Sequence, residues 1–201
     1  MLLILLSTFV SFFVTFVIAP YFMKFLYTAG VVGLDLHKSH RPKLPTSGGI
    51  CVAFGIIAGL LSYIGLNTFL YDSQANLVPL LAFLSSVLIV MFVGFLDDLN
   101  VTPKAKITKE GLDIRIGFPQ WIKPLLTLPA AIPLMVVNAG VTIMEVPIFG
   151  PVDFGIIYPL ILIPIGVVGA SNAVNLLGGF NGSEAGMGIV YLAALGLHAI
   201  I

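Results

Sequence analysis

Charged residues are scarce in this chain. Of its 201 residues, 9% are Asp, Glu, Lys or Arg, whereas 59% are hydrophobic. A soluble domain carries about 25% charged residues. The few charges are clustered between long charge-free runs, which a water-soluble core of this size could not bury. The composition therefore excludes an ordinary soluble domain and predicts an integral membrane protein that crosses the bilayer several times.

Cysteine and net charge are also nearly absent. Cys51 is the only cysteine, so an intrachain disulfide and a thiolate metal cluster are both excluded. The formal net charge is zero, which gives no indication of nucleic-acid binding. The first apolar run, 2–23, lacks a basic segment before it and a small-x-small cleavage site before Lys24. We therefore interpret it as a retained helix.

Charge-free stretches of about twenty residues recur along the chain, and this length spans roughly 30 Å of hydrocarbon. They predict an all-α, polytopic transmembrane bundle of about six helices in a single membrane domain, 1–201. The expected helices are 2–23, 49–70, 77–96, 124–141, 154–171 and 186–201. Pro159 and Pro164 are expected to kink the fifth, because each removes a backbone donor. The sixth has only 16 residues, so we expect a chain truncated within it, the N-terminal part of a larger fold.

The basic residues predict the orientation of the bundle. The loop after the first helix holds Lys24, Lys38, Arg41 and Lys43, and the loop after the third holds Lys104, Lys106, Lys109, Arg115 and Lys123. These are all nine basic residues, and the loops after the second and fourth helices contain only acidic charges. The positive-inside rule makes the basic side cytoplasmic and places the N-terminus outside. The expected location is a plasma membrane.

Two loops carry local patterns. Residues 112–118 alternate between apolar and polar, which indicates a short strand or an interfacial segment on the basic side. Residues 144–151 include two prolines and a glycine between apolar residues, which predicts a small hairpin on the opposite side.

Two adjacent carboxylates, Asp97 and Asp98, end the third predicted helix on the basic side. They repel each other, and the negative end of the helix dipole adds to the cost, so a compensating cation is expected. Carboxylate oxygens suit Mg²⁺ or Mn²⁺, which keep open positions for phosphate oxygens. The alternative is a solvated helix end that merely stops the span.

Further polar groups are expected at the same boundary. Asn172 and Asn175 are three residues apart and share one helix face, and the glycine-rich stretch 176–184 allows a ligand to approach the backbone closely. A helix exit capped by glycine is the alternative. Lys123 is either a snorkelling anchor at the membrane boundary or a phosphate contact. Lys38 and Arg41 either bind a phosphate headgroup or are present only because cytoplasmic loops are enriched in basic residues.

Three segments together resemble the polyprenyl-phosphate N-acetylhexosamine-1-phosphate transferases, glycosyl transferase family 4. They are DLHKSHRPKLPTSGG at 35–49, GFLDD at 94–98 and NAVNLLGGFNG at 172–182. The resemblance implies transfer of a sugar-1-phosphate from a UDP-N-acetylhexosamine to a membrane polyprenyl phosphate, with Mg²⁺ as cofactor and UMP as product. Bacterial cell-wall members usually have Asp at positions 178 and 181. Gly178 and Asn181 resemble the archaeal and eukaryotic branch, which transfers N-acetylglucosamine-1-phosphate to dolichyl phosphate for N-linked glycans.

The resemblance implies roles for individual residues. Asp97, Asp98 and Lys123 are expected to be catalytic, and Asn175 is expected to hold the metal together with the two aspartates. The expected substrate-binding residues are Lys38, Arg41, Asn172, Asn181, Gly182 and Glu184. The lipid bilayer and a polyprenyl or dolichyl phosphate are expected partners, nucleic acid is not, and a homodimer is left open. The Lys123 match rests on the run PLLTLPAA that follows it.

Two other functions stay open at this point. A small ion-coupled transporter would use the aspartate pair as its ion site, but such sites are expected near the bilayer midplane rather than at its edge. A catalytically inactive truncated fragment could act as an assembly partner. Full family members, as the resemblance implies, have about ten helices and a further acidic motif beyond the sixth.

Overall fold

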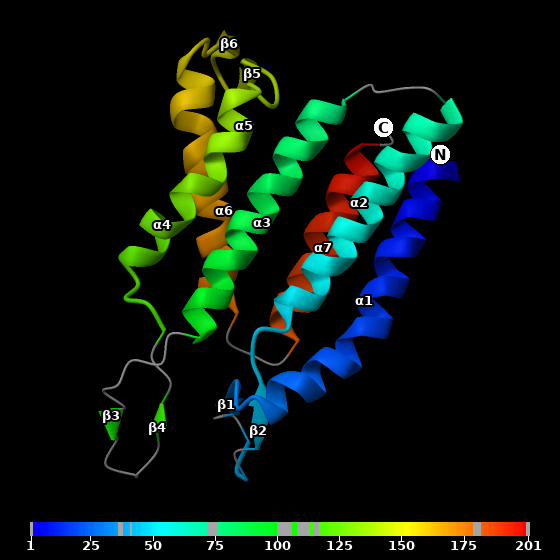
Figure 1. The fold of residues 1–201 in the computed structure, drawn as a ribbon. Coiled ribbons are helices and arrows are strands. Elements are labelled where there is room, and N and C mark those ends of the chain that lie inside the picture. Colours follow the sequence, from blue (N-terminus) through cyan, green and yellow to red (C-terminus); the bar gives the residue numbers. More distant parts are fainter. Residues whose placement is uncertain are drawn as a thin grey trace.

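The computed structural model is a bundle of helices with small sheets at its two ends (Figure 1). It describes residues 2–35, 38–40, 42–71, 76–99, 106–107, 113–114, 117–178 and 182–199. The helices are α1 (Leu2–Thr28), α2 (Gly49–Tyr71), α3 (Leu77–Leu99), α4 (Ile122–Thr127), η1 (Leu128–Ala131), α5 (Ile132–Val136), η2 (Tyr158–Leu162), α6 (Ile163–Leu177) and α7 (Ser183–His198). The antiparallel strand pairs are β1 (Val32–Leu34) with β2 (Lys43–Pro45), β3 (Lys106–Ile107) with β4 (Asp113–Ile114), and β5 (Ile143–Val146) with β6 (Gly150–Asp153).

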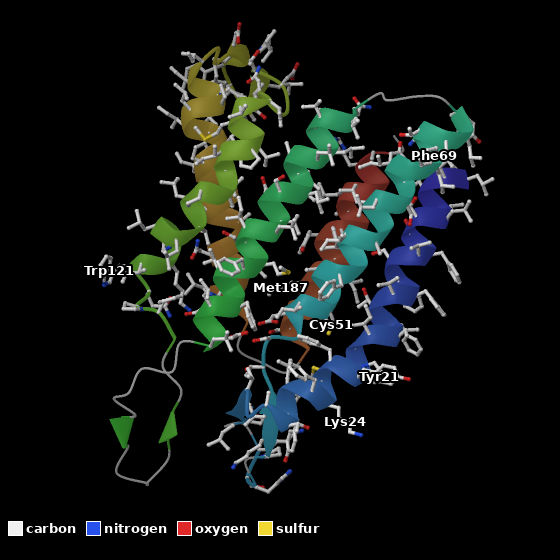
Figure 2. All side chains as sticks on the ribbon, viewed as in Figure 1. Tyr21, Lys24, Cys51, Phe69, Trp121 and Met187 are labelled. Atoms are coloured by element: carbon white, nitrogen blue, oxygen red, sulfur yellow. The ribbon has the colours of Figure 1, made fainter. Side chains whose placement is uncertain are left out.

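The outer surface of the bundle is apolar. Within the described residues, four helical runs are long and apolar enough to cross a membrane: α1, α2, α3 and the continuous run Tyr158–Leu177. Only 6% of the most apolar window of α1 is buried inside the protein, so most of it must be covered by lipid. Large side chains such as Phe69 and Trp121 project away from the bundle (Figure 2). The predicted polytopic helical membrane protein is confirmed.

The fourth predicted helix, 124–141, is divided and shorter than expected. It runs from Ile122 to Val136 as α4, η1 and α5, and prolines stand in the first turns of η1 and α5. Proline has no N–H with which to complete an α-helical hydrogen bond, so the winding changes at these points. The run ends before Asn138, whose φ of 47° is left-handed.

The fifth predicted helix is displaced towards the C-terminus. It begins with the π-helical turn η2 and continues as α6, and Pro159 and Pro164 are the second residues of these two segments. The two prolines therefore mark a change of helical winding. Because α6 extends to Leu177, Asn172 and Asn175 both lie on it. The last predicted helix, 186–201, is found as α7, which begins three residues earlier at Ser183 and ends at His198.

The two ends of the bundle carry different connections (Figure 1). At one end lie the β1–β2 and β3–β4 hairpins, the end of α3 and the start of α4; we call this the basic end. The start of α1 and the β5–β6 hairpin lie at the opposite end. Both predicted loop structures are confirmed, since β4 falls in 112–118 and β5–β6 is an antiparallel hairpin. The described basic residues Lys24, Lys38, Lys43, Lys106 and Lys123 belong to segments at the basic end.

Helices α1 and α2 approach each other closely at two glycines of α2. A Cβ on Gly59 would lie 2.7 Å from Ser11 Cβ and 2.9 Å from the carbonyl oxygen of Ser7. A Cβ on Gly55 would lie 2.7 Å from the carbonyl oxygen of Ser11. Small residues allow such close backbone packing where no hydrophobic force drives helices together in lipid. This contact fixes α2, whose start borders the site described below.

We expect Gly59→Ala to destabilise the protein by about 1–3 kcal/mol, because the added methyl group overlaps the backbone of α1. Gly65→Ala, on the same helix, is the matched control, since no described atom lies within 4 Å of its added Cβ. Thermal unfolding of the two variants in detergent, followed by circular dichroism, measures the difference. Equal unfolding midpoints would contradict the close α1–α2 contact.

Candidate functional site

A cavity of about 320 Å³ lies at the basic end of the bundle. Apolar residues of α2 and α3 form part of its wall. The polar residues that line it are Ser47, Asp97, Asp98, Lys123, Thr127, Ser171, Asn172, Asn175 and Glu184. Ligand sites are typically concave, with a few convergent polar groups in an apolar wall. The cavity therefore gathers, from α3, α4, α6 and α7, most of the polar residues that the sequence singles out.

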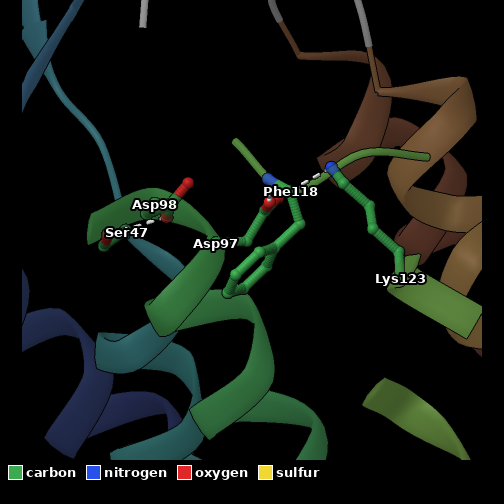
Figure 3. Close-up of polar contacts among 5 residues, drawn as sticks. All are labelled: Ser47, Asp97, Asp98, Phe118 and Lys123. Atoms are coloured by element: carbon green, nitrogen blue, oxygen red, sulfur yellow. Dashed lines mark hydrogen bonds and ion pairs between the residues drawn. The ribbon is translucent and has the colours of Figure 1, made fainter. Parts of the chain in front are cut away.

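Both carboxylate oxygens of Asp97 accept hydrogen bonds. Lys123 Nζ donates to Oδ2 at 2.7 Å, and the backbone N–H of Phe118 donates to Oδ1 at 2.5 Å (Figure 3). The side chains of Asp97 and Lys123 are 17% and 14% exposed, so water screens the ion pair only partly. A Cβ at Gly117 would lie 2.5 Å from Asp97 Oδ1, so only glycine permits this approach. Asp97 thus holds Lys123 and the segment before α4 against the end of α3.

Asp98 points away from Asp97 and towards the start of α2 (Figure 3). Ser47 Oγ donates to Asp98 Oδ2 at 2.7 Å, and the backbone N–H of Ser47 also faces this carboxylate. Ser47 itself is left-handed, with φ of 63°, where the chain turns into α2. Asp98 therefore has Ser47 as its polar partner and lines the cavity, whereas both oxygens of Asp97 accept from Lys123 and Phe118.

Two amides of α6 line the cavity. The side-chain amide of Asn172 donates to the carbonyl oxygen of Val168 at 2.8 Å and to Thr127 Oγ1 at 3.0 Å. These bonds fix its nitrogen on the protein side and leave its carbonyl oxygen as the acceptor available to a ligand. Asn175 is three residues further along α6 and is exposed.

Glu184 lines the cavity from the first turn of α7. It follows Gly182, whose φ of 84° places it in the left-handed region that favours glycine. A Cβ at Gly178 would overlap the carboxylate of Glu184 and would lie 2.8 Å from its Cγ and Cδ. Glu184 therefore occupies the space that a side chain at position 178 would need, which is where bacterial cell-wall members are expected to carry Asp.

The donor set of the cavity suits a magnesium ion shared with phosphate. Asp98, Asn175 and Glu184 supply carboxylate and amide oxygens, which Mg²⁺ prefers. In the described part of the chain, no group of three or more His, Cys, Asp or Glu is close enough to hold an ion by itself. Mg²⁺ usually takes only one or two carboxylates and completes its shell with water and phosphate oxygens, so these residues fit it.

Comparison with known proteins identifies the family. Residues 80–201 match the model of glycosyl transferase family 4. The chain belongs to this family. The resemblance that the three sequence segments predict is therefore confirmed.

Several family 4 relatives match most of this chain. It is 35% identical over 192 residues to a Saccharolobus solfataricus protein provisionally named as a UDP-N-acetylglucosamine–dolichyl-phosphate N-acetylglucosaminephosphotransferase, covering 96% of the chain and 53% of that protein. It is 28% identical over 203 residues to the Dictyostelium discoideum protein of that name, and the match covers 93% of this chain and 46% of that protein. It is 31% identical over 208 residues to a Streptococcus pyogenes phospho-N-acetylmuramoyl-pentapeptide-transferase, and the match covers 100% of this chain and 58% of that protein. The chain thus spans about half the length of these relatives.

The structure brings together some of the predicted family 4 site residues but not all. Asp97, Asp98, Lys123, Asn172, Asn175 and Glu184 line the cavity, and Gly182 precedes α7. Lys38 is not among the lining residues; its Nζ lies 3.7 Å from Oδ2 of the nearly buried Asp35, and its side chain is 49% exposed. Arg41 and Asn181 lie outside the described residues.

Sequence reasoning missed Ser47, Thr127 and the backbone N–H of Phe118. Thr127 had a usable signal, because it follows Lys123 by one helical turn and therefore shares its face. Ser47 lies in the first of the three segments, two residues before α2. No side-chain pattern could indicate the N–H of Phe118, because every residue except proline has such a group.

Proposed function

We propose that this chain transfers N-acetylglucosamine-1-phosphate from UDP-N-acetylglucosamine to a dolichyl or other polyprenyl phosphate, releasing UMP. The observation that supports it most is the cavity at the end of a membrane bundle that joins two aspartates, a lysine and two asparagines. Such a place suits a reaction between a water-soluble diphosphate and a lipid phosphate. The printed names of the Saccharolobus and Dictyostelium relatives favour this donor and acceptor.

The residues of the cavity have distinct tasks in this reaction. Donor and acceptor are both anionic and repel each other, and Lys123 places a positive charge where their phosphates would meet. Asp98, which lines the cavity, either takes the proton of the lipid phosphate or contributes an oxygen to the metal. Mg²⁺, when bound, would neutralise the donor diphosphate and stabilise the departing UMP.

The same proposal places the basic end in the cytoplasm and the N-terminus outside, in a plasma membrane. The described lysines at this end agree with the positive-inside rule. The cavity would then open towards cytoplasmic nucleotide sugars. A transporter gains no support from this arrangement, because Asp97 and Asp98 lie within two residues of the end of α3.

Transfer of radiolabel in oriented vesicles tests the function and the orientation together. Membranes are prepared from cells that express the protein from its complete reading frame, and UDP-[³H]GlcNAc is added outside. We expect label in the prenyl-lipid extract from inverted vesicles, an equal amount of released UMP, and loss of both when EDTA removes Mg²⁺. Sealed right-side-out vesicles should show neither, because the nucleotide sugar does not cross the bilayer.

Vesicles from cells that lack the protein are the control for endogenous transfer. Product from right-side-out vesicles alone would reverse the proposed orientation. An absence of product in both orientations, from a protein shown to be inserted and folded, would exclude the transferase and favour an inactive assembly partner.

A further inference from the structure

The hydroxyl of Thr127 is a buried polar group that contacts both α4 and α6. Thr127 is 6% exposed, and its Oγ1 accepts a hydrogen bond from Asn172 Nδ2 at 3.0 Å. The same oxygen lies 3.1 Å from the carbonyl oxygens of Lys123 and Pro124, to which its hydrogen is donated. One hydroxyl therefore joins the amide of α6 to the turn of α4 that carries the lysine.

Helix α4 needs such a contact to hold Lys123 in place. It is the first, six-residue part of the run Ile122–Val136, and Trp121 at its N-terminal boundary makes no side-chain capping bond in the described part. Pro124, in its first turn, supplies no backbone donor. Pro129 changes the winding of this run directly after α4, so the position of Lys123 also depends on contacts with other elements. The described polar contacts are the ion pair with Asp97 and the hydroxyl of Thr127.

The contacts form a continuous path across three helices. Asp97 on α3 pairs with Lys123, the carbonyl oxygen of Lys123 accepts from Thr127, and Thr127 accepts from Asn172 on α6. Removing the hydroxyl would take one acceptor from the amide of Asn172 and one donor from the first turn of α4. Both changes would affect residues that line the cavity, Lys123 and Asn172, although the Thr127 side chain is itself largely buried at the cavity wall.

We propose that Thr127 is a positioning residue of the site. Its hydroxyl holds Lys123 beside Asp97 and holds Asn172 with its carbonyl oxygen towards the cavity, where that oxygen is suited to accept from an N–H or O–H group of the substrate. The kinetic consequence rests on the proposed transferase function, but the structural consequence does not.

Acetylation of individual lysines tests the structural consequence without any turnover. Membranes that contain wild type, Thr127→Val or Thr127→Ser receive a short pulse of N-acetoxysuccinimide, and mass spectrometry gives the modification rate at each lysine. The valine variant keeps the shape of threonine without the hydroxyl, and the serine variant keeps the hydroxyl. We expect Lys123 to react about fivefold faster in the valine variant, as loss of one hydrogen bond predicts, and at nearly the wild-type rate in the serine variant. Lys24, which is exposed on α1, is the internal control and should not change.

The transfer assay adds a second readout. We expect Thr127→Val to lower kcat/KM for UDP-N-acetylglucosamine about tenfold and Thr127→Ser to lower it less than threefold. Should the valine variant fail to insert, Thr127→Cys, with its weaker donor, should give a Lys123 acetylation rate between those of wild type and the fivefold increase.

Two acetylation results would overturn the inference. One is an unchanged Lys123 rate in the valine variant, or in the cysteine variant where that one replaces it. The other is an equal increase in the serine variant, which would assign the effect to the methyl group. A wild-type protein that transfers no sugar would remove the proposed function, but the acetylation rates would still decide the role of Thr127.

Discussion

Asp98→Asn is expected to lower kcat/KM for sugar-phosphate transfer by about 10²–10⁴-fold, the range that loss of a catalytic acid or base produces. Asparagine keeps the size of the side chain and an oxygen that accepts from Ser47 Oγ, which now donates to Asp98 at 2.7 Å. The substitution therefore removes the charge and the basic oxygen but leaves the contact between α3 and the start of α2. Initial rates of label transfer by purified protein, at saturating Mg²⁺, measure the loss.

The control for Asp98→Asn removes an equal charge at the opposite end of the bundle. Glu145 is exposed on β5, and Glu145→Gln should transfer sugar at the wild-type rate. The unfolding midpoint of Asp98→Asn should stay within a few degrees of wild type. Activity within threefold of wild type would contradict a chemical role for Asp98 and would leave it as a contact to Ser47.

The two aspartates look equivalent in the sequence, but they are not equivalent in the structure. Adjacent residues on a helix point in directions about 100° apart, so they meet different neighbours. Asp97 is turned to Lys123 and Phe118, and Asp98 to Ser47 (Figure 3). The lysine offsets part of the repulsion between the two carboxylates. The sequence predicts that the pair needs a compensating cation, and the structure shows that Lys123 supplies positive charge to Asp97.

The course of the helices could be predicted because the bilayer dictates it. Hydrocarbon thickness fixes the length of a spanning helix, so charge-free runs locate α1, α2 and α3 to within a few residues except at the end of α1. Hydropathy contains no information on backbone hydrogen bonding, so the predicted bounds of the later helices were less accurate. Prolines leave the hydropathy of 124–141 high but change the winding of this helix. The polar Asn172 ends the apolar run, although α6 itself continues to Leu177.

The site could be predicted in part for a related reason. Topology alone brings the ends of α3 and α6 and the start of α4 to one face, so their polar residues were expected to meet. Which of them pair depends on contacts between residues far apart in the chain, such as Asp97 with Lys123 and Asn172 with Thr127. Side-chain direction at that distance is set by packing and is not encoded in local periodicity.

Gly178 and Glu184 are neighbours in space, which their positions in the sequence do not indicate. In the sequence, Gly178 resembles the archaeal and eukaryotic branch, whereas bacterial cell-wall members usually have Asp there. In the structure, the carboxylate of Glu184 fills the adjacent space and lines the cavity, so the two residues are best understood as one feature. A side chain at position 178 would require the side chain of Glu184 to move.

Lys123→Met is expected to lower kcat/KM by about 10²–10³-fold, because preorganised positive charge is lost where phosphates are expected to react. It should also destabilise the protein by about 1.5–3 kcal/mol, the usual contribution of a hydrogen bond to a charged group. The reason is that Asp97, which is largely shielded from water, would lose its cationic partner. Lys123→Arg should recover stability more than activity, because the guanidinium fork keeps the charge but not the position of Nζ. Thermal unfolding and initial transfer rates measure the two effects separately.

A double substitution separates the two roles of Lys123. In Asp97→Asn/Lys123→Met no unpaired charge remains, so part of the lost stability should return. Activity should not return if the lysine also serves the phosphates, because neutralising Asp97 supplies no positive charge to the cavity. If transfer recovered together with stability, the lysine would be only the structural partner of Asp97, and charge compensation of the substrates would have to come from other residues of the basic end.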